Sequence, residues 1–188
     1  MLACYFRHMA LNDSPQNVSD LELVNRTIDI DKEYFNELVR RYSAKIYRYL
    51  NRLLSRNTAD VDECFSETFL KAYVNLSTYN PRVPFSAWLY RIAHNQAIDY
   101  MRRNVHRNSV ELEEWHAVYD PAEEYIDRDY LASMLRRISS DERNLLILFY
   151  LEGLSLQEIS DIIKIKPNTI AVRIKRAKAK IRKTHEQH

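Results

Sequence analysis

Hydrophobic residues recur every three or four positions through most of the chain, which is the spacing of one face of an α-helix. The longest such run predicts an amphipathic helix over residues 31–55. Three further helices are expected around it, beginning near Ser19, near Asn57 and at Phe85, the last of them ending at about Arg103. Because four such helices can share one apolar core, they predict a compact domain over residues 19–105. Residues 1–18 are expected to form a flexible lead.

Residues that cap helices mark where several elements should begin and end. Two serine–glutamate pairs have the spacing of a capping box: Ser19 with Glu22, and Ser155 with Glu158. Ser140 is expected to cap a helix over residues 141–152. Gly153, the only glycine of the chain, stands where that helix needs a left-handed terminating residue. A short helix to about Ile163 and a last helix beginning near Asn168 should follow.

The periodicity is lost between the predicted domains. Residues 104–120 show no helical spacing and hold many acidic residues, so we interpret residues 106–120 as an acidic linker. Helical patterning resumes at Pro121 and predicts a second domain over residues 121–184, followed by a tail at 185–188. The predicted fold class is therefore all-α, with a four-helix domain and a helix-turn-helix domain.

The composition excludes several classes of protein. A single glycine cannot supply a Walker phosphate loop or the glycine fingerprint of a dinucleotide-binding fold. Cys4 and Cys64 make neither a disulfide framework nor a zinc site, and the histidines lack the spacing of metal ligands. We predict no catalytic residues, no metal and no cofactor, and a buried, inert Cys64. Without a bilayer-spanning apolar run or a secretory leader, the expected location is the cytoplasm.

The net charge of +2 hides two blocks of opposite sign. Residues 164–188 contain nine basic side chains and one acidic, whereas residues 107–129 contain eight acidic and two basic. The basic block follows a short helix and a tight turn, which is the helix-turn-helix pattern. Its last helix carries an apolar stripe of Ile170, Ile174, Ala177 and Ile181. Packing of that stripe would leave the basic residues for DNA phosphates, although a solvated basic helix of an ordinary bundle is the alternative.

Three segments, in this order, resemble segments of bacterial sigma factors. The stretch DVDECFSETFLKAY (60–73) is similar to the helix with which those factors grip RNA polymerase. The stretch PFSAWLYRIAHNQAIDYMRR (84–103) looks like their promoter-melting segment, and SLQEISDIIKIKPNTIAVRIKRAKAKIRK (155–183) resembles their second promoter-binding domain. Two such domains joined by a short linker are typical of the extracytoplasmic-function (ECF) class of the sigma-70 superfamily. The resemblance covers roughly residues 19–184.

The resemblance implies roles for residues of the first domain. Four acidic residues would dock on the clamp helices of the largest polymerase subunit: Asp60, Asp62, Glu63 and Glu67. A solvated acidic face is the alternative. The loop at residues 77–84 would receive a flipped base of the minus-ten promoter element. Six residues would contact minus-ten DNA: Tyr79, Trp88, Arg91, Asn95, Arg102 and Arg103. Three of these share a helical face through their spacing, and for Trp88 a core position is the alternative.

The resemblance also implies that the last helix reads the minus-thirty-five element. Asn168 and Thr169 would hold phosphate, and the groove residues would be Ala171, Val172, Arg173, Lys175, Arg176 and Lys178. The chain departs from the family pattern at several positions. Ser66 stands in place of a common Gln, Lys164 in place of the glycine of the turn, and Lys166 in place of the serine cap. Ala171 and Val172 replace a typical basic residue and a typical serine, respectively. We therefore predict a left-handed backbone at Lys164 and an unusual or weak recognition of the minus-thirty-five element.

These features predict an ECF-type sigma factor, a non-catalytic subunit that binds core RNA polymerase, recognises both promoter elements and assists melting. The implied partners are the clamp helices of the largest subunit, the flap of the second subunit, promoter DNA, and an anti-sigma factor or another regulator or recruiter, with no membrane insertion. The main alternative is a stand-alone helix-turn-helix transcription regulator that binds duplex DNA as a dimer. A helical adaptor that binds only proteins is a third. The sequence leaves open whether the two domains pack on each other.

Overall fold

The computed structural model describes residues 18–54, 58–105 and 138–185, and in these ranges the chain is helical with no strand. In chain order the elements are α2 (Asp20–Asp29), α3 (Tyr34–Leu54), α4 (Thr58–Val74), the 3-10 helix η2 (Leu76–Thr78), α5 (Phe85–Val105), α7 (Ser140–Leu146), the π-helix η3 (Ile147–Leu151), α8 (Leu156–Ile163) and α9 (Pro167–His185). The predicted all-α fold class is confirmed. The predicted acidic linker, the start of the second domain and nearly all of the lead lie outside the described residues.

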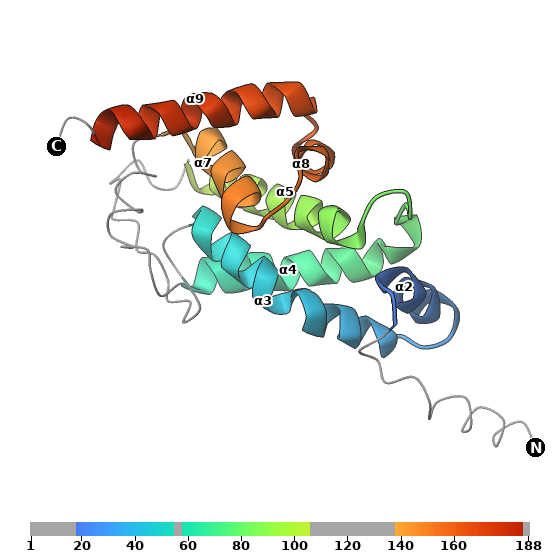
Figure 1. Ribbon diagram of the computed structural model, residues 1–188. Helices are drawn as coiled ribbons and strands as arrows, with labels where there is room; N and C mark the ends of the chain where they lie inside the picture. Colours follow the sequence, from blue (N-terminus) through green and yellow to red (C-terminus); the bar gives the residue numbers. More distant parts are fainter. Residues whose placement is uncertain (1–17, 55–57, 106–137, 186–188) are drawn as a thin grey trace, which may run out of the picture.

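Helices α2–α5, here called the N-terminal unit, surround one apolar core. Helices α3, α4 and α5 pack along one another and α2 crosses the beginning of α3 (Figure 1). The predicted stripe of α3 points inward, and Leu38, Ile46 and Leu50 are each fully buried. Val61 of α4 and Leu89 of α5 complete the same cluster. Burial of one face per helix is what the spacing of three and four predicts.

One helix start differs from its prediction, and at another the glutamate of the expected capping box pairs with a different residue. Helix α3 begins at Tyr34, because the Asp31 carboxylate accepts a hydrogen bond from the Glu33 N–H at 2.9 Å and holds a turn there. At α2 the Ser19 hydroxyl accepts from the Glu22 N–H at 3.2 Å, as expected. The Glu22 carboxylate accepts from Arg26 at 2.8 Å, so this glutamate stabilises the helix by an i,i+4 pair.

Helices α7–α9, here called the C-terminal unit, contain the predicted helix-turn-helix. Ser155 and Glu158 form a complete capping box at the start of α8, as predicted. Lys164 ends α8 with φ 59° and ψ 36°, which confirms the left-handed residue expected at the turn. The stripe of α9 packs on α7 and α8, with Ile170 and Ala177 fully buried.

The helix predicted over residues 141–152 is divided in two. Ser139, and not Ser140, is its N-cap, because Ser139 has extended backbone and forms a capping box with Glu142. The α-helix ends at Leu146 and continues as η3, where the Ile147 carbonyl accepts from the Glu152 N–H at 3.0 Å. The four side chains 145–148 are all buried, so the amphipathic spacing carries no signal here. Gly153 follows with φ 68°, as predicted.

The two units pack against each other. Helix α8 lies on α5, and η3 contacts α3 (Figure 1). Buried apolar side chains from both units belong to one continuous cluster. The structure therefore answers the question that the sequence left open, and it places the helix-turn-helix beside the loop between η2 and α5.

Candidate nucleic-acid interface

The loop that leads from η2 to α5 is shaped by an aromatic cluster. The hydroxyl of Tyr79 donates a hydrogen bond to the Val83 carbonyl at 2.7 Å. The Tyr79 ring lies 5.5 Å from the ring of Phe85 and 5.4 Å from that of Trp88. Tyr79 is half-buried. The structure thus places this predicted DNA contact where it fixes the shape of the loop, with its polar atom on the loop's own backbone.

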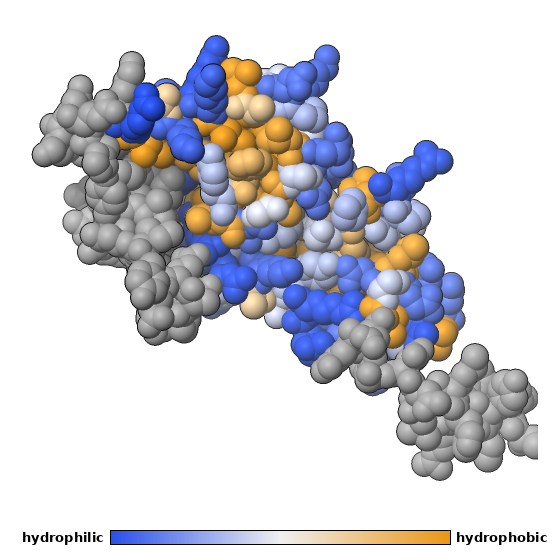
Figure 2. Space-filling view, viewed as in Figure 1, coloured by the Kyte–Doolittle hydropathy of each residue, from blue (hydrophilic) through white to orange (hydrophobic). Residues whose placement is uncertain are grey.

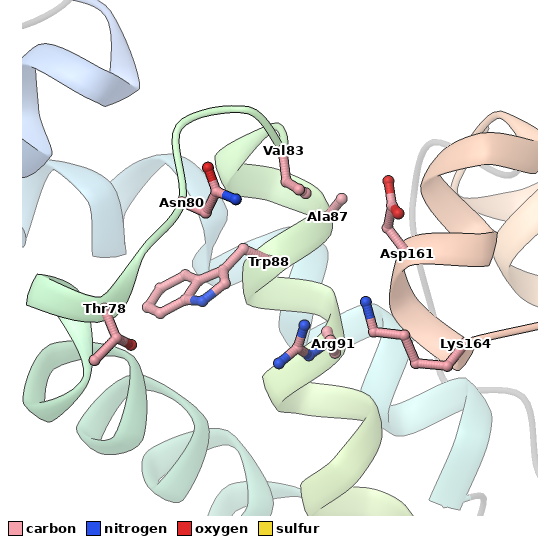
Figure 3. Close-up of a pocket in the computed structure, with 8 residues that line it drawn as sticks. All are labelled: Thr78, Asn80, Val83, Ala87, Trp88, Arg91, Asp161 and Lys164. Carbon is pink, nitrogen blue, oxygen red and sulfur yellow. The ribbon is translucent and has the colours of Figure 1, made fainter.

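A hollow of about 240 Å³ opens between this loop and α5. Figure 3 shows its lining: Thr78 from η2, Asn80 and Val83 from the loop, Ala87, Trp88 and Arg91 from α5, and Asp161 and Lys164 from the C-terminal unit. The Trp88 indole extends from α5 toward Thr78, and the Arg91 side chain lies beside it. An aromatic face next to a guanidinium suits an unstacked base with its phosphate.

Of the three α5 residues predicted to share one face, Trp88 and Arg91 line this hollow and Asn95 does not. Trp88 is half-buried, with one side in the aromatic cluster, so it is both a core residue and part of the lining. Arg91 and Asn95 are exposed, and Asn95 lies one turn further along α5, outside the lining. Arg102 and Arg103 are exposed near the end of α5.

The four acidic residues predicted to dock on polymerase do not form a single face. Asp60, Glu63 and Glu67 recur at three and four along α4 and share one side. Asp62 points toward Tyr47 of α3. The pKa of Tyr47 is raised by burial, by the negative charge of Asp62 and by a hydrogen bond to Asp62. The predicted acidic face is therefore divided, with Asp62 on the α3 side.

Two exposed apolar residues of α4 were not among the predicted site residues. Leu70 is 56% exposed and Val74 is 68% exposed. They continue the Glu63–Glu67 face at the same spacing toward the end of the helix. The sequence pattern contains a signal for them, because both residues fall outside the apolar stripe that packs α4 into the core. A pair of exposed aliphatic side chains on one helical face favours contact with a partner.

The last helix presents most of its predicted residues to solvent. Asn168, Thr169, Val172, Arg173, Lys175, Arg176 and Lys178 are exposed, and Ala171 is half-buried. Figure 2 shows hydrophilic side chains projecting from the α9 edge of the molecule, with hydrophobic residues gathered beneath them over α7. The Lys178 ammonium lies 5.6 Å from the centre of the Tyr150 ring. Lys180 binds Glu142 at 2.5 Å, and this hydrogen bond lowers the pKa of Glu142.

The described residues offer little for redox or metal chemistry. Cys64 is buried in α4, where burial and the nearby Glu63 and Asp60 raise the pKa of its thiol to about 11. A thiol with this pKa stays protonated at neutral pH and is a poor nucleophile. No three His, Cys, Asp or Glu side chains gather as metal ligands in the described ranges. None of the described helices is long and apolar enough to cross a membrane.

Comparison with known protein families matches both units. The model for Sigma-70 region 2 matches residues 38–107, and the model for Sigma-70, region 4 matches residues 128–181. The chain is 34% identical over 181 residues to the ECF RNA polymerase sigma-E factor of Haemophilus influenzae, covering 88% of this chain and 95% of that protein. It is 30% identical over 168 residues to the ECF RNA polymerase sigma factor SigW of Bacillus subtilis, covering 81% and 89%.

Solved structures agree on the fold. The complex of CnrH with the cytosolic domain of CnrY matches with a TM-score of 0.67 at 24% identity, covering 88% of this chain and 96% of the matched one. The sigma factor RpoE of Bartonella quintana, solved with the anti-sigma factor NepR, matches with a TM-score of 0.69 at 21% identity, covering 81% and 96%. With both family models in order and relatives matched along nearly their whole length, the chain belongs to the ECF sigma factors of the sigma-70 superfamily.

Proposed function

We propose that this chain is a non-catalytic initiation subunit that directs core RNA polymerase to promoters and captures the opened minus-ten strand. The hollow beside Trp88 and Arg91 carries this proposal, since both of these residues lie in the part of the chain that matches Sigma-70 region 2. An exposed aromatic edge and a cation hold an unstacked base and its phosphate without any reaction. The free energy of capture would then favour the melted promoter, and no hydrolysis is needed.

Two other surfaces would bind RNA polymerase and the minus-thirty-five element. The face of α4 with Glu63 and Glu67 would dock on the clamp helices of the largest polymerase subunit, with Leu70 and Val74 supplying apolar contact area beside the charges. The C-terminal unit would contact the flap of the second subunit and place α9 in the major groove at the minus-thirty-five element.

A protein regulator is the further partner that we infer. Solved relatives of the same fold were obtained with CnrY and with the anti-sigma factor NepR bound. We infer that an anti-sigma factor or a comparable regulator or recruiter binds this chain, and that the chain acts in the cytoplasm, where polymerase is found.

Run-off transcription tests this function. Purified core polymerase, genomic promoter fragments and the chain should give transcripts from defined starts that core alone does not give. Asn95→Ala should lower the rate of promoter opening about fivefold, the value of one lost hydrogen bond, with little change in binding to core. The matched control is Asn25→Ala, an exposed asparagine on α2, which should leave the rate unchanged.

The outcomes separate the candidate functions. Transcripts that depend on both core and this chain support the initiation role. Binding of duplex DNA without any binding to core would identify a stand-alone regulator. An Asn95→Ala protein that opens promoters as fast as the Asn25→Ala control would remove Asn95 from the minus-ten surface.

A further inference from the structure

The hollow beside Trp88 is lined by both units of the chain. Trp88 and Arg91 line it from α5, whereas Asp161 and Lys164 line it from the end of α8 (Figure 3). Its volume of about 240 Å³ is below the ~300–1,000 Å³ of sites for drug-sized ligands. The hollow therefore suits a smaller molecule that touches both units at once.

Two cationic side chains reach the hollow from opposite sides. In Figure 3 the Lys164 side chain extends from α8 toward the Arg91 guanidinium on α5. Neither side chain forms a hydrogen bond or an ion pair with another residue in the described ranges. Two like charges that face each other across a partly enclosed space repel. An anion between them would remove this repulsion, so the pair favours a phosphate-sized anionic group.

The backbone of Lys164 is a second, independent observation. It has φ 59° and ψ 36°, a left-handed conformation that is strained for a side chain but free for glycine. The Lys164 N–H donates to the Ser160 carbonyl at 2.9 Å, a bond that glycine would form equally well. Strained residues persist mainly where they serve a site. The turn itself does not require a lysine, whereas an anion site in the hollow does.

Trp88 supplies an aromatic platform on the other side of the hollow. Its ring centre lies 5.4 Å from that of Tyr79 and 5.5 Å from that of Phe85, and the residue is half-buried. These neighbours hold the indole in place, and the part of the ring that they leave uncovered lines the hollow. A planar ring can stack there at little entropic cost, because the platform is already ordered.

The remaining polar groups of the lining favour a ligand that also carries hydrogen-bond donors. The Asn80 side-chain oxygen accepts from the Arg82 N–H at 3.0 Å, which leaves the Asn80 amide group to donate. The Asp161 carboxylate has no partner in the described ranges and can accept from a sugar hydroxyl or the amino group of a base. A carboxylate would disfavour a bare phosphate ion. A planar base, a hydroxylated sugar and one phosphate together match the whole lining.

We propose that this hollow is a binding site for a free ribonucleoside monophosphate, whose base stacks on Trp88 and whose phosphate lies between Arg91 and Lys164. Asp161 accepts a hydrogen bond from the sugar or the base. Because the lining comes from both units, the bound nucleotide stabilises their contact. It also occupies Trp88 and Arg91 and so competes with the minus-ten strand. Only this last consequence rests on the proposed function.

Isothermal titration calorimetry of the full chain tests the site. The probes are the four ribonucleoside monophosphates, compared with inorganic phosphate and with the four nucleosides. At least one monophosphate should bind with a stoichiometry of one, and more tightly than phosphate or its own nucleoside, because each of those makes only part of the contacts. No binding of any monophosphate at millimolar concentration would overturn the proposal, as would equal affinity for phosphate alone.

Lys164→Gly separates binding from folding. The variant loses the ammonium and also loses the backbone strain, so its nucleotide affinity should fall by about tenfold or more, the value of a charge-assisted hydrogen bond, while its resistance to urea rises. A purely structural role for Lys164 would not weaken binding in a more stable protein. The matched control is Lys166→Ala, an exposed lysine outside the lining, which should leave the affinity unchanged. Equal affinities of the two variants would overturn the proposal.

Tryptophan fluorescence shows where the nucleotide binds. The chain has two tryptophans, so in a Trp115→Phe background the emission comes from Trp88 alone, and stacking of the base should quench it as the site fills. Arg91→Ala should weaken this quenching by about tenfold in affinity, and the control Arg82→Ala, exposed and outside the lining, should not. Heat of binding without quenching would place the nucleotide elsewhere and overturn the site.

The transcription test of the proposed function is independent of these measurements. A chain that binds a monophosphate at Trp88 but gives no transcripts with core polymerase would contradict the proposed function and leave the nucleotide site supported. A chain that gives transcripts but binds no monophosphate would overturn the nucleotide site and leave the proposed function intact.

Discussion

Two residues of the C-terminal unit hold a left-handed backbone. Gly153 has φ 68° after η3, and Lys164 has φ 59° at the turn of the helix-turn-helix. A side chain in this conformation costs about 1 kcal/mol, because Cβ approaches the following carbonyl oxygen. The chain therefore accepts strain at Lys164 and avoids it at Gly153.

Gly153→Ala should lower the free energy of unfolding by about 1 kcal/mol. A Cβ at this position meets no atom within 4 Å, so the cost is backbone strain and not a clash. Urea unfolding followed by circular dichroism measures it. Gly153→Asn is the control and should cost less, because asparagine tolerates the left-handed region. An alanine variant as stable as the wild type would contradict the strain.

The sequence shows which side chains are charged or aromatic, but it does not show the direction in which each one points in the fold. Asp62 was grouped with Asp60, Glu63 and Glu67, yet it lies toward Tyr47. The sequence left open whether Trp88 is a core residue or a DNA contact, and in the structure it is half-buried and lines the hollow beside α5. Such choices depend on the neighbouring helix, which the local pattern does not contain.

At the scale of the element, α9 holds two kinds of basic residue. Lys178 and Lys180 interact with Tyr150 and Glu142 of their own unit, near the middle of the helix. Arg173 and Arg176 are exposed closer to its start. Since recognition helices read base edges with their N-terminal residues, the groove contacts should come from the first two turns. These turns also hold Ala171 and Val172, whose small apolar side chains offer no hydrogen bond to a base.

Ala171→Lys should raise the affinity for duplex minus-thirty-five DNA and increase its salt dependence by about one counterion. The physical reason is an added phosphate or base contact at a half-buried position beside the exposed face. Anisotropy with duplex promoter DNA at several salt concentrations measures both quantities. The control is Ala44→Lys on α3, an exposed alanine far from α9 in sequence. Equal effects from the two variants would show that position 171 does not face the groove.

At the scale of the whole molecule, the protonation state of His94 affects how stably the two units pack on each other. Burial lowers the pKa of His94 below its ordinary value of 6.5, and the charge of Asp141 on α7 opposes this shift. The Tyr49 hydroxyl from α3 and the Asn144 amide from α7 also face the ring. The packed arrangement therefore prefers the neutral imidazole.

The radius of gyration should rise as the pH falls below about 6.5. The stabilisation from neutral His94 is present above the ordinary pKa and is lost as protonation becomes favourable in the separated units. Small-angle scattering between about pH 7.5 and 5.5 measures the change. His94→Gln keeps a hydrogen-bonding group without a titrating one and should flatten the profile. A wild-type profile that is already flat, or one that His94→Gln reproduces, would contradict this coupling.

The helices, most of their capped ends and the separation of an acidic block from a basic one can be predicted from the local sequence. These features depend on interactions within a few residues, such as the Ser155–Glu158 capping box and the spacing of Ile170 and Ile174. The π-helical turn at 147–151 and the contact of α8 with α5 become visible only in the folded chain. Folding also brings Lys164 beside Trp88. These depend on side chains far apart in the chain, whose approach is fixed by packing and leaves no local pattern.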